Sequence, residues 1–125
     1  MATLPPYAAS HQRLQHQRLQ LAIYTPVVYD AAVIRSVRLS RRAEKDLERV
    51  PDHIAFKLRG WIDAIEYEGL ERVRRIPGYH DEPLEGIWRG HRSIRLSRAY
   101  RAIYRITTDE SLELVYVERV TKHEY

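Results

Sequence analysis

Residues 87–108 read IWRGHRSIRLSRAYRAIYRITT, and the rest of the chain is organised around this segment. In its first half Ile94 and Leu96 alternate with Ser93 and Arg95. In its second half the alternating residues are Arg101, Ile103 and Arg105 on one side and Ala102, Tyr104 and Ile106 on the other. A period of two residues is typical of β-strands, because successive side chains of a strand point to opposite faces. The segment therefore predicts two short strands joined as a hairpin.

The same segment carries six arginines and no lysine, aspartate or glutamate. These are Arg89, Arg92, Arg95, Arg98, Arg101 and Arg105. Like charges on one hairpin repel each other unless an anion lies across them, and the guanidinium fork matches the geometry of phosphate. We therefore expect a polyanion, most simply a nucleic-acid backbone, as the partner. The alternative is that the arginines pair with the 17 acidic residues of the chain and form an ordinary solvated surface.

Composition limits the class of protein. A chain of 125 residues suits one domain, and its 44% hydrophobic content allows a modest core. The net charge of +4 favours acidic partners. With no cysteine, disulfides, thiol nucleophiles and Cys-type zinc sites are excluded. No apolar run approaches the length of a membrane span, and the N-terminus lacks the plan of a secretory signal, so we expect a soluble cytoplasmic protein.

The first 32 residues differ from the rest. They contain the direct repeat HQRLQ at residues 11–15 and 16–20, are rich in glutamine and are interrupted by prolines. We expect residues 1–32 to be a poorly ordered arm and residues 33–125 to form the single folded domain. A second hypothesis is that translation begins at a non-Met codon near Val33, because Met1 is the only methionine.

The folded part predicts two helices after one strand. Residues 33–39 read as a strand, Ser40 as the N-cap of a helix over 41–49, and residues 52–68 as a second helix that stops at Gly69. The apolar stripe of this second helix is predicted to consist of Ala55, Leu58, Ile62 and Ile65, widened by Ile54, Phe56 and Trp61. Packing on a sheet explains this stripe better than a metal or cofactor role.

The second half of the chain completes the sheet. Residues 69–86 predict an irregular connector, because Pro77, Gly78 and Pro83 interrupt regular structure. Leu112–Val120 predicts a last strand after a turn. The order β-α-α-β-β-β predicts an α+β fold, in which a small antiparallel sheet is covered on one face by the two N-terminal helices. The exposed face is expected to carry the arginines.

RNA cleavage needs few groups once phosphates are held across the hairpin. A base takes the proton of a 2′-hydroxyl, the oxygen attacks the adjacent phosphorus, and an acid protonates the leaving 5′-oxygen. Glu82 is a candidate base, and His123 is a candidate acid or base because imidazole titrates near neutral pH. Arg95 and Arg101 would stabilise charge on the phosphorane, and Tyr125 would stack on a base or donate a proton. This chemistry needs no metal ion or other cofactor.

Several ordered pieces of residues 33–125 resemble the RelE/ParE superfamily of bacterial toxins, and most closely its RelE/YoeB-type mRNA interferases. These pieces are the sheet-and-two-helix order, EPL before a glycine, the IRL strand, the YRAIYRI strand and the terminal TKHEY. The resemblance implies a type II toxin that cuts mRNA, usually on the ribosome, by 2′-hydroxyl attack. It also implies a cognate antitoxin, with operator DNA reached only through the antitoxin complex.

Carried over residue by residue, the resemblance assigns an acidic catalytic role to Glu82 and phosphate handling to Arg95 and Arg101. His123 and Tyr125 match the C-terminal acid/base and aromatic residues of the family, although Glu124 separates two residues that are adjacent in the YoeB-like pattern. The remaining cations are expected to bind RNA, and they are Arg89, Arg92, Arg98, Arg105 and Lys122.

Two other functions stay open at this point. ParE-like members of the superfamily share the fold but inhibit DNA gyrase without being enzymes, and the chain could also be an inactive nucleic-acid-binding domain. ParE-like chains generally lack both the acidic residue ahead of the second strand and the His/Tyr end. The presence of Glu82, His123 and Tyr125 therefore favours the ribonuclease.

Overall fold

The computed structural model describes residues 33–122. Its elements in chain order are β1 (Val37–Leu39), α3 (Arg41–Leu47), α4 (Asp52–Glu68), α5 (Leu70–Arg74), the 3₁₀ turn η2 (Pro77–Tyr79), β2 (Glu82–Pro83), the 3₁₀ turn η3 (Gly86–Trp88), β3 (Arg92–Arg95), β4 (Tyr100–Asp109) and β5 (Leu112–Lys122). The predicted arm and the predicted catalytic residues His123 and Tyr125 lie outside this range. Within it, no helix is both long enough and apolar enough to cross a membrane.

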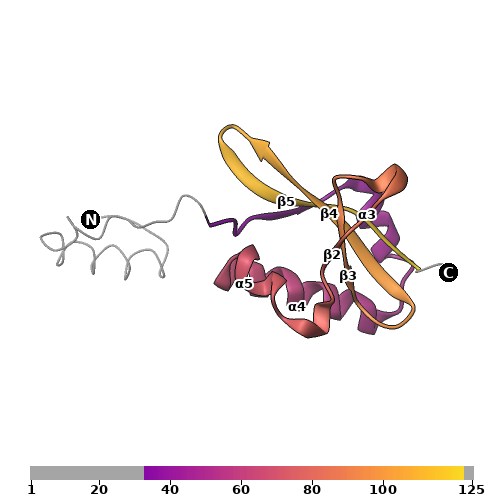
Figure 1. Ribbon diagram of the computed structural model, residues 1–125. Helices are drawn as coiled ribbons and strands as arrows, with labels where there is room; N and C mark the ends of the chain where they lie inside the picture. The colour runs from indigo at the N-terminus through magenta and orange to yellow at the C-terminus, as the bar shows by residue number, and fades with distance from the viewer. Residues whose placement is uncertain (1–32, 123–125) are drawn as a thin grey trace, which may run out of the picture. The chain divides into compact units, whose positions relative to one another are not determined.

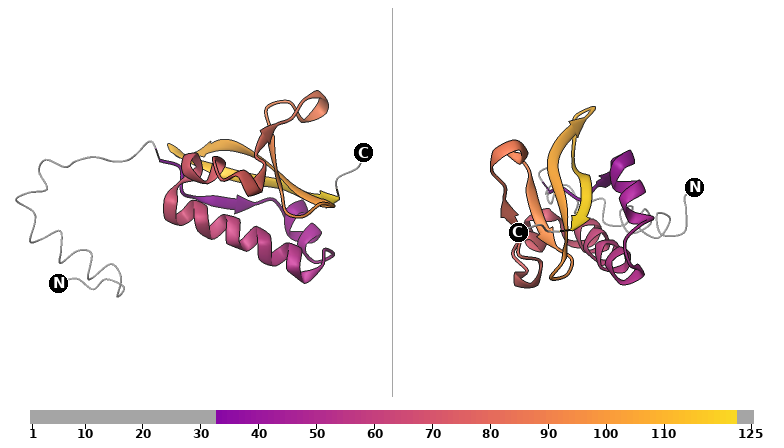
Figure 2. Two further views of the ribbon diagram at one scale, coloured as in Figure 1. Left: turned by 60° about the horizontal axis from the view of Figure 1, so that its bottom comes forward. Right: turned by 90° about the vertical axis from the view of Figure 1, so that its right-hand side faces the viewer.

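The five strands form one sheet in the order β1-β5-β4-β3-β2 (Figure 1). Neighbours pair antiparallel except β1, which runs parallel to β5 with Val37 opposite Val115. Both α3 and α4 lie on one side of the sheet, and the loop between β2 and β3 rises on the other side (Figure 2, left). The predicted α+β architecture is confirmed, but the sheet is mixed rather than wholly antiparallel, because side-chain alternation carries no information about strand direction.

The core lies between α4 and the sheet. The buried stripe of α4 consists of Ile54, Leu58, Trp61 and Ile65. The Trp61 ring packs 5.3 Å from the ring of Tyr104 on β4, which is also fully buried. The prediction that Phe56 widens this stripe is wrong, because its side chain is 76% exposed. Phe56 follows Ile54 by two positions, which turns it about 200° around the helix.

The element boundaries follow the sequence signals with three differences. Ser40 caps α3 as predicted, since its Oγ accepts a hydrogen bond of 2.9 Å from the Ala43 N–H. However, α3 ends at Leu47, β1 covers only the last three residues of its predicted range, and β5 continues to Lys122. The predicted irregular connector, residues 69–86, also contains the short helix α5 and the strand β2. This strand lies at the sheet edge, where a proline such as Pro83 costs no ladder hydrogen bond.

Candidate active site

The hairpin brings two predicted catalytic arginines together. Arg95 of β3 lies directly opposite Arg101 of β4, and Arg101 in turn is in register with Thr121 of β5. Side chains of directly opposed residues point to the same face of a sheet. The sequence could not establish this register, and the structure shows that Arg95 and Arg101 share one face.

A cavity of about 160 Å³ opens over this face. Four of the predicted site residues line it, namely Glu82, Arg95, Arg98 and Arg101. Four residues outside the predicted set complete its wall, namely His80, Ser93, Ser97 and Tyr100. Three guanidinium groups on a cavity of this size favour an anion as the ligand, and the carboxylate beside them is a proton acceptor.

Arg101 is the least solvated of the three cavity arginines. Its side chain is 22% exposed, and its Nη2 lies 3.9 Å from Oε2 of Glu82. Its Nε is buried and has no hydrogen-bond partner among residues 33–122. Leaving a buried donor unpaired costs about 1–3 kcal/mol, and a phosphate oxygen in the cavity would supply the missing acceptor.

A buried polar network fixes the loop that carries Glu82. The neighbouring Asp81, whose side chain is 1% exposed, accepts hydrogen bonds from Arg92 Nε at 2.6 Å and from the Tyr104 hydroxyl at 2.7 Å. Burial and this bond to Asp81 raise the pKa of the Tyr104 phenol. Burial lowers the pKa of Arg92, but the hydrogen bond and charge of Asp81 outweigh it, so that its pKa is raised.

This network includes one predicted site residue, Arg92, and holds it away from the cavity. Arg92 precedes Arg95 by three positions on β3, and an odd separation along a strand turns the two side chains to opposite faces. The Arg92 guanidinium is held by Asp81 instead of lining the cavity. Arg92 therefore has a structural partner inside the molecule, and its role in RNA binding stays a prediction.

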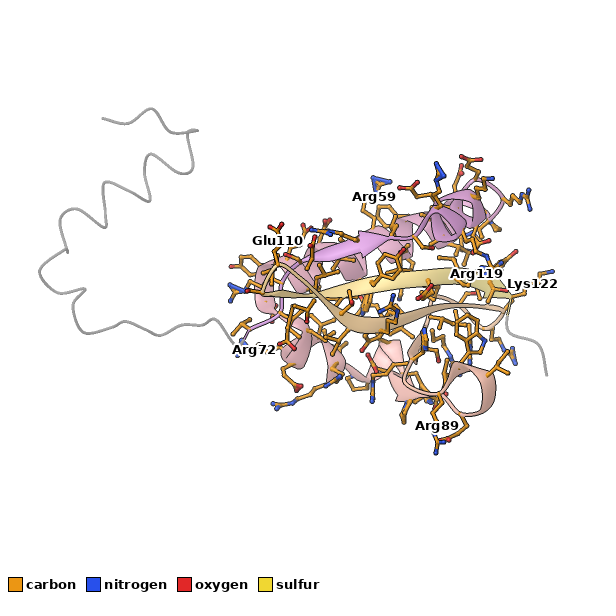
Figure 3. The ribbon with its side chains drawn as sticks, turned by 90° about the horizontal axis from the view of Figure 1, so that it is seen from above. Arg59, Arg72, Arg89, Glu110, Arg119 and Lys122 are labelled. Carbon is orange, nitrogen blue, oxygen red and sulfur yellow. The ribbon has the colours of Figure 1, made fainter. Side chains whose placement is uncertain are left out.

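Of the other predicted RNA-binding residues, Arg98 lines the cavity, and the remaining three lie outside it. Arg105 donates a hydrogen bond of 2.7 Å to Glu118 and stacks 4.9 Å from the ring centre of Tyr116. Arg89 and Lys122 are exposed, and both lie toward the end of the sheet opposite the β4–β5 turn (Figure 3). The interpretation that arginines of this segment pair with acids thus holds for Arg92 and Arg105, while the role of the exposed cations stays a prediction.

His80 is the titratable cavity residue that the sequence interpretation left out. It lines the cavity together with Glu82, and its backbone adopts a left-handed conformation with φ of 50°. The signal in the sequence is its place beside two acids, Asp81 and Glu82, in a loop bounded by prolines. Among residues 33–122 no cluster of three or more His, Asp or Glu side chains could hold a metal ion.

The family follows from a sequence comparison. A family model described as the ParE toxin of the type II toxin–antitoxin system parDE matches residues 37–124. The chain belongs to the RelE/ParE superfamily of type II toxin–antitoxin toxins. The match takes in the whole sheet of this toxin and every residue of the cavity.

Solved structures show the same fold. YafQ from E. coli is 22% identical to this toxin, with a TM-score of 0.56 over 71% of this chain and 93% of YafQ. A YoeB/ParE toxin from Agrobacterium tumefaciens is 20% identical, with a TM-score of 0.52 over 71% and 99%. The toxin–antitoxin complex RelBE2 from Mycobacterium tuberculosis matches at 26% identity and a TM-score of 0.50 over 73% and 100%. No curated protein sequence matches the toxin.

Proposed function

We propose that this toxin is a metal-independent endoribonuclease that cuts mRNA in the cytoplasm, on the ribosome, and thereby inhibits translation. The observation that carries the proposal is the cavity in which Glu82 lies beside Arg95 and Arg101. The unpaired Nε of Arg101 supports a phosphate as the ligand, because the cavity then supplies an acceptor for a buried charged donor.

The proposed reaction uses groups of this chain only. Glu82 takes the proton of the 2′-hydroxyl, and the freed oxygen attacks the adjacent phosphorus. Arg95 and Arg101 stabilise the additional charge on the phosphorane oxygens. His123 protonates the departing 5′-oxygen, and Tyr125 stacks on the neighbouring base. The products are a 2′,3′-cyclic phosphate on one fragment and a 5′-hydroxyl on the other.

The proposed regulatory partner is a cognate antitoxin. Membership of the type II toxin family and the match to RelBE2, which was crystallised as a toxin–antitoxin complex, support this partner. Operator DNA is reached only through the toxin–antitoxin complex, and no cofactor takes part in the cleavage.

Inhibition of DNA gyrase is the second candidate function, because the matching family is described by ParE. A non-enzymatic inhibitor has no need of a carboxylate beside cavity arginines. Two assays on the same purified toxin distinguish these functions. One measures cleavage of mRNA on programmed ribosomes, and the other measures DNA supercoiling by gyrase.

The test compares wild type with Glu82→Gln, Arg101→Ala and the control Arg59→Ala. Arg59 is an exposed arginine of α4, and it does not line the cavity (Figure 3). We expect each cavity substitution to slow cleavage by about 100-fold or more, as loss of one transition-state donor or base does. Arg59→Ala should cut as wild type does. Equal cleavage by wild type and both cavity variants would overturn the proposed site.

A further inference from the structure

One edge of the end of β5 pairs with β4, and the other edge is held by the α3 segment rather than by a strand. β1 covers the outer edge of β5 only from Val115 to Val117. Beyond that point a bulge between Ile103 and Tyr104 leaves Glu118 without a cross-strand partner on β4. The last residues of β5 would therefore present an unpaired edge just where the strand is locally distorted.

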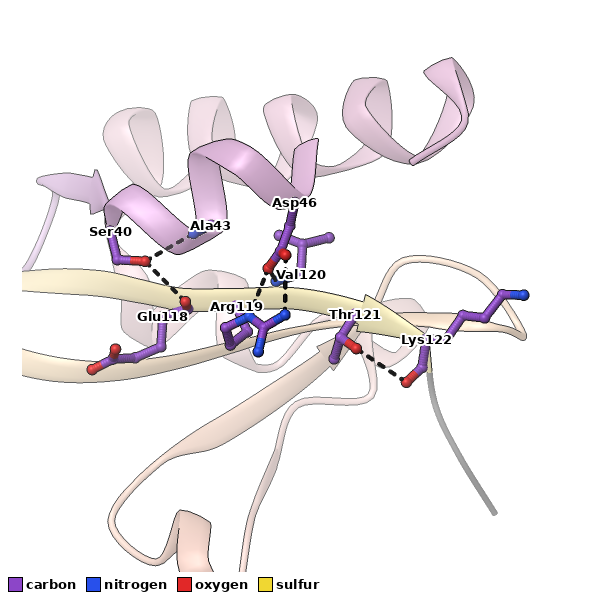
Figure 4. Close-up of polar contacts among 8 residues, drawn as sticks. All are labelled: Ser40, Ala43, Asp46, Glu118, Arg119, Val120, Thr121 and Lys122. Atoms are coloured by element: carbon purple, nitrogen blue, oxygen red, sulfur yellow. Dashed lines mark hydrogen bonds and ion pairs between the residues drawn. The ribbon is translucent and has the colours of Figure 1, made fainter. Parts of the chain in front are cut away.

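Two side chains of the α3 segment cover this edge (Figure 4). The Ser40 backbone N–H donates to the Val117 carbonyl, and its hydroxyl donates to the Glu118 carbonyl, each at 2.9 Å. Two residues further on, the Val120 N–H donates to Oδ2 of Asp46 at 2.8 Å. Ser40 and Asp46 thus continue the pairing of β5 after β1 has ended.

Asp46 also forms an ion pair with Arg119. Besides Val120, it receives Arg119 Nε on Oδ2 at 2.8 Å and Arg119 Nη2 on Oδ1 at 3.0 Å. Its side chain is only 14% exposed. Burial raises the pKa of this carboxyl, but the hydrogen bonds from Arg119 and Val120 and the charges of Arg119 and Arg42 outweigh it, so that the pKa is lowered. A bidentate guanidinium–carboxylate pair fixes both distance and orientation.

We call the contacts of Asp46 with Arg119 and Val120 the clamp. The residues just after it lie at the candidate active site. Thr121 is in register with Arg101, and Lys122 is in register with Tyr100, and both partners line the cavity. Residues 123–125, which include the proposed acid His123, follow directly in the chain. The contacts of Val120 therefore hold the part of β5 that runs on to Thr121 and Lys122, opposite the cavity residues Arg101 and Tyr100.

We propose that Asp46 is a positioning residue for RNA cleavage, which acts through Arg119 and Val120 to hold the end of β5 against the cavity. The proposal rests on the ribonuclease function. Asp46 does not line the cavity, so its loss should leave RNA binding by the cavity arginines intact and slow the chemical step. Misplacement of a catalytic group by about 1 Å costs roughly 100-fold in rate.

The test uses two graded variants and two controls. Asp46→Asn keeps an oxygen for the Val120 N–H but loses the charge that pairs with Arg119, whereas Asp46→Ala loses both. Asp109→Asn removes a short Arg–Asp pair that lies away from the cavity, in which Asp109 Oδ2 is 2.7 Å from Arg38 Nη1 at the β4–β5 turn. Ile65→Val is a core truncation in α4 that controls for a general loss of stability.

We expect Asp46→Ala to lower kcat by roughly tenfold or more, Asp46→Asn to lower it less, and both to leave KM within about twofold. The controls should keep the kcat of wild type at a temperature where every variant is folded. In a His123→Ala background, Asp46→Ala should add no further loss, because both changes act on the same group.

Three results would count against the inference. If Asp46→Ala loses no more kcat than Ile65→Val, or if its loss multiplies with that of His123→Ala, Asp46 is merely structural. If the loss appears in KM alone, the clamp serves binding. A wild type that cuts no mRNA overturns the proposed function and this inference with it, whereas an active wild type with unaffected Asp46 variants overturns the inference only.

Discussion

The network beneath the cavity makes a quantitative prediction. Substituting Asp81→Ala removes a carboxylate that is 1% exposed and that accepts bonds of 2.6 Å from Arg92 and 2.7 Å from Tyr104. Breaking a buried ion pair costs about 3–5 kcal/mol, because the remaining charge stays desolvated. Arg92 keeps 29% of its side chain exposed, so that we expect the lower end, about 3 kcal/mol in the free energy of unfolding.

The milder variant Tyr104→Phe removes only the hydroxyl that donates to Asp81. A hydrogen bond to a charged group contributes about 1.5–3 kcal/mol, so this variant should lose about half as much as Asp81→Ala or somewhat more. In the double variant the two losses of unfolding free energy should not add, since both substitutions remove contacts of the same Asp81 carboxylate.

Thermal and urea unfolding of the full chain measure these losses. For a domain of this size, about 3 kcal/mol corresponds to a fall in Tm of at least about 12 °C. The control is Asp63→Ala, which removes an exposed aspartate of α4 and should change stability by less than about 0.5 kcal/mol. An Asp81→Ala protein that unfolds like the Asp63→Ala control would refute the network as a source of stability.

Four further predictions follow from single residues. Because the pKa of Tyr104 is raised in the folded state, its stabilising effect is complete below pH 10.0 and falls as the pH rises further, so alkaline melts of wild type should decline more steeply than those of Tyr104→Phe. Because the pKa of Asp46 is lowered, its contribution is present above pH 3.8 and lost as the pH falls below it, and acid unfolding of Asp46→Asn should lack that step. Phe56→Ser should change the free energy of unfolding by under about 0.5 kcal/mol and Trp61→Ala should cost about 3–5 kcal/mol, as urea titration would report; equal losses would contradict the burial of α4. His80→Ala should slow RNA cleavage, because its side chain lines the cavity together with Glu82, and cleavage at the rate of wild type would remove His80 from the candidate site.

Local signals in the sequence were sufficient for α3, α4 and the hairpin, but not for the short helix α5. The Ser40 cap, the span of α4 and the two strands of the arginine segment each depend on residues close together in the chain. The same period-two pattern was silent on the parallel pairing of β1 with β5, which depends on residues far apart. A two-residue strand such as β2 is too short to show any period.

The candidate site was predictable as a set of residue types but not as a geometry. Glu82, Arg95 and Arg101 were identified from the chemistry that RNA cleavage requires, and the structure brings them to one cavity. That Arg92 lies on the other face was not predictable, because charge alone does not reveal which face a strand residue occupies. Its partner Asp81 lies eleven residues earlier, and only the paired strands bring the two together.

The most direct test of the account is the chemistry of the RNA ends left by the purified toxin acting on mRNA programmed into ribosomes. The account predicts fragments that end in 2′,3′-cyclic phosphate and begin with 5′-hydroxyl, produced by wild type and about 100-fold more slowly by Glu82→Gln. Fragments with other ends, equal cleavage by Glu82→Gln, or intact mRNA together with inhibited gyrase would contradict it.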